Sequence, residues 1–336
     1  MEQLSNLNTL FSAHLCLNMA RVKALSMIIL ALIEARNIRL SEMARYFTLS
    51  QAKIDSCFKR MQRFLKQVVF PKDKLAKLIL KISNVNDDEK LTLVFDRTNW
   101  KYGKSHLNFL FLAFVYKGIA IPLFWCVLVD KKSGCSSFNE RIELVELFLK
   151  VFGKEKVNCI LGDREFIGYK WIGWLKDQEL PYVIRLPEAS TNIEHGGITQ
   201  KASQLFSKMR IATHKSIGLC TVGITNPYQS NISAYRNKLG VLVVLLHDNY
   251  VGDSVGLYAK RWEIENMFRA FKTSGFNLES THVTHPERLS QLIGVLALAF
   301  CFAYKAGLII ASKKKTEKEA WLLSLQSYPD GVGCVV

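Results

Sequence analysis

The chain has 336 residues, of which 49% are hydrophobic and 22% are charged, and its formal net charge at pH 7 is +16. This length and hydrophobic content exclude an intrinsically disordered protein and allow two or three structural units with a substantial core. The excess of Lys and Arg favours an acidic partner, with nucleic acid the leading candidate and an anionic membrane the second.

The eight cysteines are dispersed and include no Cys-x-x-Cys pair. Several lie within apolar segments, so we interpret them as buried thiols in the reducing cytoplasm rather than as metal ligands or disulfides. The N-terminal residues contain no compact basic-then-apolar leader, and no signal peptide is expected.

Residues 10–82 show apolar spacings of three and four, which predict helices throughout. Within residues 1–85, Lys and Arg outnumber Asp and Glu by 14 to 5. The segment 40–65 resembles a helix-turn-helix in which Ser50 caps the second helix. A plain three-helix bundle fits the same pattern, but the basic excess favours a DNA-binding domain over residues 1–85. Its second helix would present to DNA the basic side chains of Lys53, Lys59, Arg60 and Arg63.

A polar break at 84–89 precedes a predicted α/β unit. Asp96 ends the apolar run 91–95, and Asp163 ends a second run over 157–162. Both runs are typical of strands that are covered on both faces of a sheet. An Asp directly after such a strand lies at the carboxyl edge of the sheet, where open α/β sheets place their sites. We therefore expect the two carboxylates to lie close together.

The apolar stretch 107–129 is interrupted at Lys117-Gly118, which favours a hairpin of two strands over a membrane helix. Two helices and a further strand are expected at 138–152, 169–178 and 181–186. A hairpin requires antiparallel pairing and helical crossovers require parallel pairing, so the fold class is α/β with a mixed sheet. This order of elements is that of the ribonuclease H-like fold.

Residues 187–252 are rich in Gly, Ser, Thr and Asn and contain short strands, which we interpret as a β-rich insertion. The insertion separates Asp163 from Glu265 by 102 positions, so only folding can bring these carboxylates together. Asp253 or the residue after it can cap the helix that carries Glu265. The apolar stretch 292–304 is shorter than a bilayer requires and is expected to be a buried helix, so no membrane partner is predicted.

The predicted helix 258–272 divides into an apolar face and a charged face. At about 100° per residue, the side chains of the charged face, four of them charged and one a phenol, fall within an arc of roughly 80°. They are Tyr258, Arg261, Glu265, Arg269 and Lys272. One interpretation is an amphipathic helix whose charged face is solvated. Together with the two Asp residues, the row instead indicates a site for a polyanion and a hard metal ion, because three carboxylates without thiol or imidazole favour Mg²⁺ or Mn²⁺.

These motifs resemble the bacterial insertion-sequence transposases of the DDE type, in the branch with a β-strand insertion and a Tyr-x2-Arg-x3-Glu-x6-Lys motif. The segments 94–98 and 161–166 resemble the two aspartate regions of that family, and the resemblance extends from about residue 88 to 305. The four residues of the motif are matched by Tyr258, Arg261, Glu265 and Lys272.

The resemblance implies that Asp96, Asp163 and Glu265 are catalytic and bind two divalent metal ions, Mg²⁺ or Mn²⁺. One ion would activate a water or a 3′-hydroxyl, and the other would stabilise the leaving oxygen. The Tyr, Arg and Lys of the motif would contact phosphates near the end of the element. Arg269 joins them by helical phase alone.

The resemblance also implies cut-and-paste transposition through hairpin intermediates, with terminal inverted repeats and target DNA bound by a homodimer in a paired-end complex. Relatives often use a Trp of the insertion to stabilise a flipped base, but residues 187–257 contain no Trp. Tyr228, Tyr235 or Tyr250 could stack in its place.

The resulting organisation has a helical DNA-binding domain and a ribonuclease H-like core that is divided by the insertion. The expected boundaries are 1–85, 86–186, 187–252, 253–312 and a C-terminal tail, 313–336. Two other functions remain open: a transposition-defective repressor that binds the DNA of its own element, and another ribonuclease H-like nuclease such as a junction resolvase. An intact acidic triad argues against the first, and the Tyr-Arg-Glu-Lys spacing has no evident use in the second.

Overall fold

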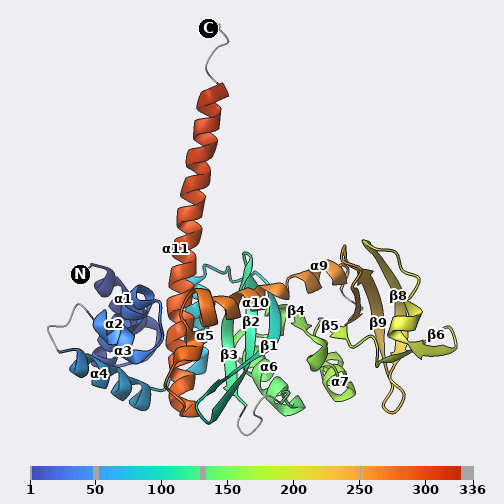
Figure 1. The fold of residues 1–336 in the computed structure, drawn as a ribbon, viewed down its shortest axis with the longest axis horizontal. Helices are drawn as coiled ribbons and strands as arrows, with labels where there is room; N and C mark the ends of the chain where they lie inside the picture. The colour runs from blue at the N-terminus through green and yellow to red at the C-terminus, as the bar shows by residue number, and fades with distance from the viewer. Residues whose placement is uncertain (1, 48–52, 129–133, 250, 327–336) are drawn as a thin grey trace, which may run out of the picture.

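The computed structural model describes residues 2–47, 53–128, 134–249 and 251–326. The chain begins with five helices, as the apolar spacing predicts, and continues into a mixed α/β region (Figure 1). The N-terminal helices are α1 (Glu2–His14), α2 (Met19–Ala35), α3 (Leu40–Arg45), α4 (Ile54–Gln67) and α5 (Lys72–Ile82).

The second helix of the expected helix-turn-helix differs from the prediction. Its N-cap residue is Lys53, so α4 begins later than a cap at Ser50 would place it. Ser50 and the rest of the expected turn lie outside the described residues.

A ten-stranded sheet forms the centre of the molecule, in the order β3-β2-β1-β4-β5-β10-β9-β8-β6-β7. The first five strands in the sequence are β1 (Leu91–Tyr102), β2 (Ser105–Tyr116), β3 (Ile119–Val127), β4 (Val157–Gly162) and β5 (Tyr182–Leu186). Strand β1 pairs antiparallel with β2 and parallel with β4, and β4 pairs parallel with β5. The predicted mixed sheet is therefore confirmed, and its first half has the ribonuclease H-like arrangement.

The predicted hairpin is formed by β2 and β3 and turns at Lys117-Gly118, whose φ angles are 48° and 92°. Two consecutive residues with positive φ are the signature of the tight turn that matches the twist of a hairpin. The two crossover helices are also close to their expected positions: α6 (Phe138–Phe152) precedes β4, and α7 (Tyr169–Asp177) precedes β5.

The insertion adds its strands to the same sheet. It contains β6 (Asn192–His195), β7 (Ile198–Lys201), α8 (Ala202–Leu205), β8 (Thr213–Val222), β9 (Tyr228–Arg236) and β10 (Leu242–His247). Strand β10 pairs antiparallel with β5, and β9 pairs with β10. The insertion thus continues the sheet beyond β5, and the edge of β5 is covered.

The C-terminal part forms α9 (Ser254–Ala259), α10 (Trp262–Arg269) and α11 (Pro286–Gln326). Helix α9 lies against β5, β9 and β10, whereas α10 and α11 return to the first half of the sheet at β3. Two successive residues of β3 show how helices cover both faces. The Phe124 ring meets Phe152 of α6, whereas Trp125 contacts Phe111, which in turn meets Phe268 of α10. The sheet is therefore packed between α6 on one face and α10 on the other.

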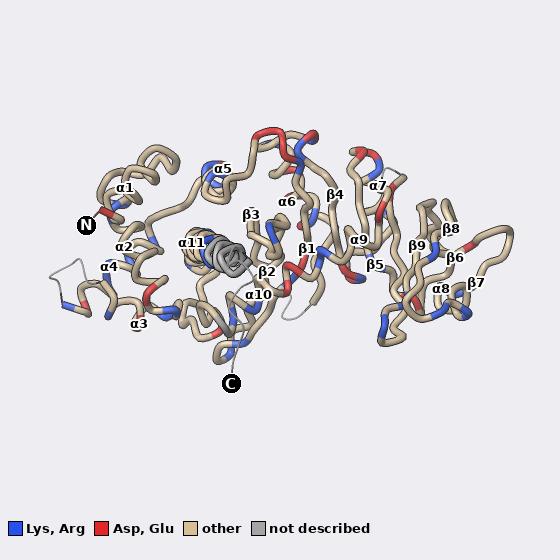
Figure 2. The backbone as a smooth tube through the Cα atoms, turned by 90° about the horizontal axis from the view of Figure 1, so that it is seen from above, with Lys and Arg blue, Asp and Glu red and all other residues tan. Residues whose placement is uncertain are grey.

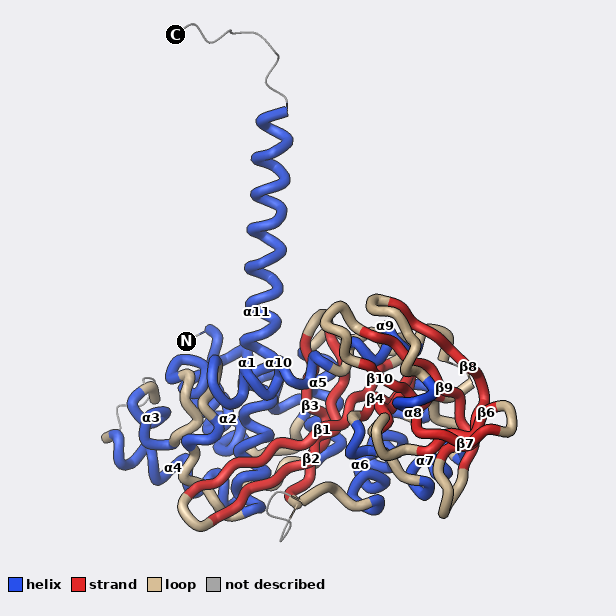
Figure 3. Tube along the Cα trace, turned by 45° about the vertical axis from the view of Figure 1, so that its right-hand side comes forward, coloured by secondary structure: helices blue, strands red, loops and turns tan. Residues whose placement is uncertain are grey.

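Helix α11 is much longer than the expected buried segment 292–304 and extends away from the rest of the molecule (Figure 3). The expected boundary of a tail at residue 313 falls inside this helix. By length and composition alone, Pro286–Lys314 is a segment of the described chain that could cross a membrane, and 50% of its most apolar window is buried inside the protein.

Candidate active site

The pairing of β1 with β4 brings Asp96 and Asp163 to the same level of the sheet. The last residues paired between the two strands are Val94 and Leu161. Each Asp lies two residues beyond its paired residue, so the register that aligns the strands also aligns the carboxylates. This juxtaposition was expected from the two apolar runs.

The position of Asp96 within its strand was not expected. Strand β1 continues to Tyr102 instead of ending before Asp96, because β2 pairs with it antiparallel along this whole length. Only the parallel pairing with β4 stops, at Val94. Asp96 therefore lies at the carboxyl edge of the parallel part of the sheet, although it is in the middle of a strand.

Asp163 is placed by a tight turn directly after β4. Residues 164–166 form a single 3₁₀ turn, and the Phe166 N–H donates to the Asp163 carbonyl over 2.9 Å. A Cβ on Gly162 would lie 2.9 Å from the Phe166 Cβ, so this close approach requires glycine. The Phe166 ring stacks on Phe95, which fixes the turn against β1.

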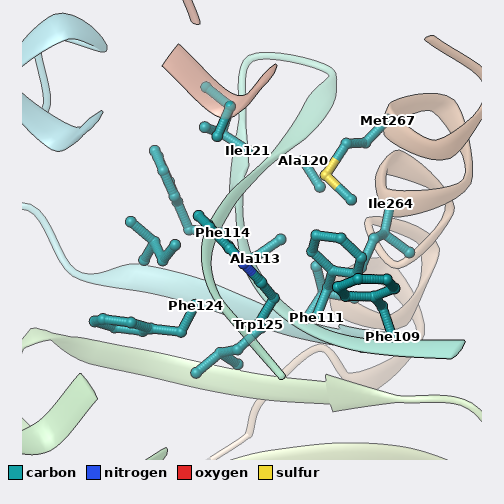
Figure 4. Close-up of a cluster of buried hydrophobic side chains, with 14 of the residues drawn as sticks. Phe109, Phe111, Ala113, Phe114, Ala120, Ile121, Phe124, Trp125, Ile264 and Met267 are labelled. Carbon is teal, nitrogen blue, oxygen red and sulfur yellow. The ribbon is translucent and has the colours of Figure 1, made fainter. Parts of the chain in front are cut away.

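Glu265 is carried by α10, whose apolar face anchors it to the sheet. Ile264 and Met267 are fully buried and point towards the side chains of β2 and β3 (Figure 4). The Phe268 ring lies 5.6 Å from that of Phe111, in an edge-on contact. The predicted apolar face is thus the packed face, and Glu265 is held on the helix above the carboxyl edge.

The long helix expected over 258–272 is interrupted twice. Helix α9 ends at Ala259, where the N–H groups of Lys260 and Arg261 bond to carbonyls three residues back. After α10, residues 270–274 form a π-helical turn. Asp253 caps α9, since its Oδ1 accepts from the Gly256 N–H over 2.8 Å. The expected cap is therefore present, but it belongs to α9 and not to α10, the helix that carries Glu265.

Arg261 is the counter-ion that two of the three carboxylates contact, and the charge of the third also acts on it. One of its terminal nitrogens donates to Glu265, and the other lies 3.6 Å from Asp96 Oδ2. Burial disfavours the charge of Arg261, but Tyr258, Glu265 and Asp163 outweigh this and raise the pKa of the guanidinium. The Arg261 side chain is only 12% exposed.

Asp96 is electrostatically perturbed. Burial raises the pKa of its carboxyl to about 7, and the nearby charges of Glu165 and Asp163 act in the same direction. The Arg97 N–H, which donates to Asp96 Oδ1 over 2.7 Å, and the Arg261 guanidinium oppose the increase. A buried carboxyl with a raised pKa beside other carboxylates is typical of a functional site.

The remaining residues of the charged row differ from one another in burial and in their contacts. Tyr258 is 6% exposed, and its ring faces the Arg261 guanidinium at 5.7 Å. Burial raises the pKa of its hydroxyl to about 12. Lys272, in the π-helical turn, pairs with Glu279 at 2.9 Å and donates to the Asn99 carbonyl at 3.3 Å. Arg269 is exposed at the end of α10.

Arg97 and Glu165 form an ion pair that sequence reasoning missed. The Arg97 Nε lies 2.8 and 2.9 Å from the two carboxylate oxygens of Glu165, and Nη2 lies 2.9 Å from one of them. Another guanidinium nitrogen donates to the Gly134 carbonyl over 3.0 Å. The signal was present in the sequence, because each residue directly follows or nearly follows an expected catalytic Asp. Their pairing across 68 positions was not visible there.

Arg141 of α6 bonds to the turn that follows Asp163, and this residue was not predicted from the sequence either. It is 6% exposed, and its guanidinium donates to the Glu165 carbonyl over 2.9 Å and to the Ser136 carbonyl over 3.0 Å. The guanidinium lies 5.0 Å from the centre of the Phe166 ring. Arg141 therefore fixes the backbone between α6 and the turn that carries Asp163.

The basic residues expected on the helix-turn-helix, Lys53, Lys59, Arg60 and Arg63, lie on or beside α4. In Figure 1, α4 and β4 lie on opposite sides of α11, so these residues are not part of the carboxylate cluster. Of the tyrosines considered for base stacking, Tyr228 and Tyr235 are half-buried on β9, and Tyr250 lies outside the described residues.

The donor set is chemically suitable for a hard divalent cation. Asp96, Asp163 and Glu265 offer only carboxylate oxygens, which Mg²⁺ and Mn²⁺ prefer. In the structure Arg261 contacts Asp96 and Glu265, and the charge of Asp163 acts on its guanidinium. Within the described ranges, no three or more His, Cys, Asp and Glu side chains are grouped so that they could hold a metal ion.

The chain is similar to a solved transposase structure, and part of it matches a transposase family model. The chain is similar to piggyBac transposase, solved by cryo-EM as a synaptic complex with hairpin DNA, with 11% identity and a TM-score of 0.44 over 90% of this chain and 72% of that chain. No curated protein matches the chain. A family model for the transposase DDE domain matches residues 140–302, which include Asp163 and Glu265 and begin after Asp96. This match supports a DNA transposase of the DDE type, an enzyme that cleaves and transfers DNA.

Proposed function

We propose that this protein is a metal-dependent transposase that excises its own insertion sequence and joins it to target DNA. The observation that carries the proposal is the buried guanidinium of Arg261, which contacts Asp96 and Glu265 and is also affected by the charge of Asp163. The three carboxylates come from segments far apart in the sequence. The match of the transposase DDE model to residues 140–302 supports the same reaction class.

In this proposal, Asp96, Asp163 and Glu265 hold two Mg²⁺ or Mn²⁺ ions. The bound metal supplies Lewis-acid activation of a water or 3′-hydroxyl and stabilises the leaving oxygen. Asp96 must lose its proton before it can serve as a ligand, and its raised pKa makes this step sensitive to pH near neutrality.

The cations of the row position the substrate. Arg261, Arg269 and Lys272 contact phosphates near the end of the element, because each carries a charge on the segment that holds Glu265. Tyr258 is buried and acts through Arg261, whose guanidinium it faces. The basic side chains of α4 bind the terminal inverted repeat, and a homodimer holds the two ends together.

A second candidate is a repressor that binds the element but does not cut it. The contacts of Arg261 favour this alternative, because this residue already neutralises two of the carboxylates that a metal would need. Both candidates predict DNA binding, and only the first predicts cleavage.

The test uses a labelled duplex that carries the inverted repeat flanking the coding sequence. Cleavage at the repeat boundary is measured with Mg²⁺ or Mn²⁺ and with EDTA, for the wild type, Asp163→Asn and the control Asp177→Asn, an exposed carboxylate on α7. We expect metal-dependent cleavage by the wild type and the control and none by Asp163→Asn. Binding without cleavage by the wild type would favour the repressor, and equal cleavage of unrelated four-way junctions would favour a resolvase.

A further inference from the structure

A groove in the N-terminal part of the molecule is lined by basic side chains from three helices. One section is formed by α2 and α4 and includes Arg21, Arg60 and Arg63. The adjoining section shares Arg63 and adds Lys59, Lys66 and the Arg288 side chain from the first turns of α11. The lining residues of both sections include no Asp or Glu. We name these two joined sections the basic groove.

The amphipathic character of α4 determines which of its side chains enter the groove. Met61, Phe64 and Leu65 are buried on one side of the helix. The exposed Lys59, Arg63 and Lys66 follow one another at spacings of four and three on the other side. Figure 2 shows Lys and Arg along α4. The helix therefore displays a row of charge that continues beyond its own length through residues of α2 and α11.

The start of α11 is fixed relative to α4. The Phe70 N–H, just after α4, donates to Gln291 Oε1 over 2.9 Å, and a Cβ on Gly294 would meet the Phe70 ring at 2.9 Å. Arg288 lies one turn before Gln291 on the same helix. The packing between α11 and the end of α4 therefore determines where Arg288 lies relative to Lys59, Arg63 and Lys66.

The six cations of the basic groove have no ion-pair partner within the described residues. Elsewhere in the described chain, Arg97, Arg185 and Arg261 pair with carboxylates. One carboxylate, Glu287, lines the neighbouring pocket, which shares Lys66 and Arg288 with the groove. A groove that concentrates unpaired positive charge is complementary to a polyanion.

We propose that the basic groove binds the phosphate backbone of duplex DNA. The stretch from Lys59 to Lys66 extends over about 10 Å of helix, a length in which duplex DNA carries about six phosphate charges. The inference rests on the proposed function and deepens it, because it identifies the surface that takes the DNA. It adds Arg21, Lys66 and Arg288 to the residues expected from the sequence, and it leaves out Lys53, which does not line the groove.

The experiment measures binding of the full-length protein to a short duplex of arbitrary sequence by fluorescence anisotropy over a series of NaCl concentrations. Arg21→Gln and Arg288→Gln, singly and together, are compared with Lys23→Gln and Lys77→Gln, which remove exposed charges of α2 and α5 outside the groove. Each groove variant should reduce the slope of log K against log salt by about one, and the double variant by about two. The two control variants should keep the wild-type slope.

Arg21→Lys and Arg288→Lys retain the charge and should retain the slope, which separates loss of charge from misfolding. Unchanged slopes in both Gln variants would overturn the proposal. If the two Gln variants bind DNA as the wild type does but no longer bind phosphatidylglycerol vesicles, the proposal is overturned in favour of a membrane surface. If the wild type fails to cleave DNA but the slopes change as expected, the basic groove stands and the proposed chemistry fails. If the wild type cleaves DNA but the slopes do not change in the Gln variants, the proposed chemistry stands and the basic groove is overturned.

Discussion

Arg261 holds together carboxylates that would otherwise repel one another. Asp96 and Glu265 contact its terminal nitrogens, and Asp163 contributes to its electrostatic environment. The side chains of Arg261 and Asp96 are only 12% and 21% exposed, so burial acts against the charge of both groups. The ionisation of Asp96 is therefore a sensitive measure of the balance of charge at the site.

Asp96→Asn should stabilise the metal-free protein at pH 8 and have little effect at pH 4. The pKa of Asp96 in the folded protein is about 7, above the ordinary value of 3.8. Its contribution to stability is therefore fully present below pH 3.8, where the carboxyl is neutral, and is lost as the pH rises through 7, because the folded protein must then bury a charge. The difference between these pKa values corresponds to at most about 4 kcal/mol, and the 21% exposure of the side chain reduces it. Urea unfolding in EDTA at both pH values tests this, and an equal effect at both would contradict it.

The Arg97–Glu165 pair provides a second test at this scale. Arg97→Ala and Glu165→Ala should each destabilise the protein by about 2 to 4 kcal/mol, because each leaves a charge that is only 15% to 20% exposed without its partner. The double variant should cost clearly less than the sum of the single variants. The exposed pair of Lys154 and Glu179 is the control, and its removal should leave stability nearly unchanged. Additive losses at Arg97 and Glu165 would show that the two residues act independently.

At the scale of elements, local patterns predicted the order of helices and strands but not every boundary. The hairpin was predictable because Lys117-Gly118 interrupts an apolar run at a turn. The extension of β1 past Asp96 depends on pairing with β2, which is a tertiary effect. A reading at 100° per residue assumed one regular helix over 258–272. A regular period does not reveal that the Arg261 N–H bonds to a carbonyl only three residues back, or that residues 270–274 form a π-helical turn. Lys272 lies in that turn and pairs with Glu279.

Helix α10 links core packing to the position of Glu265. Met267→Ala removes a fully buried side chain between α10 and the sheet and should cost about 2 to 5 kcal/mol. Trp262→Ala, on the same helix, removes a side chain that is 54% exposed and should cost less than about 1 kcal/mol. Urea unfolding measures both. A similar cost for the two variants would mean that α10 is not anchored through its buried face.

At the scale of the whole molecule, the expected boundary near residue 85 does not separate two hydrophobic cores. The Phe11 ring of α1 contacts Phe302 of α11 at 6.3 Å, and the Ile38 N–H donates to the Phe276 carbonyl over 2.8 Å. Buried residues of the N-terminal helices, the sheet and α11 form one continuous cluster. We therefore expect the helices that line the basic groove and the sheet that carries the carboxylates to unfold together, as one cooperative unit.

Phe11→Ala should consequently destabilise the sheet as well as the N-terminal helices. The Phe11 side chain is fully buried, and its removal should cost about 3 to 5 kcal/mol. If the molecule unfolds as one cooperative unit, this loss should speed hydrogen exchange of the most protected β1 and β4 amides, which exchange only by global opening. Met19→Ala, which alters an N-terminal side chain that is 53% exposed, is the control and should leave those amides unchanged. Faster exchange confined to α1–α5 would show that the N-terminal helices open independently of the sheet.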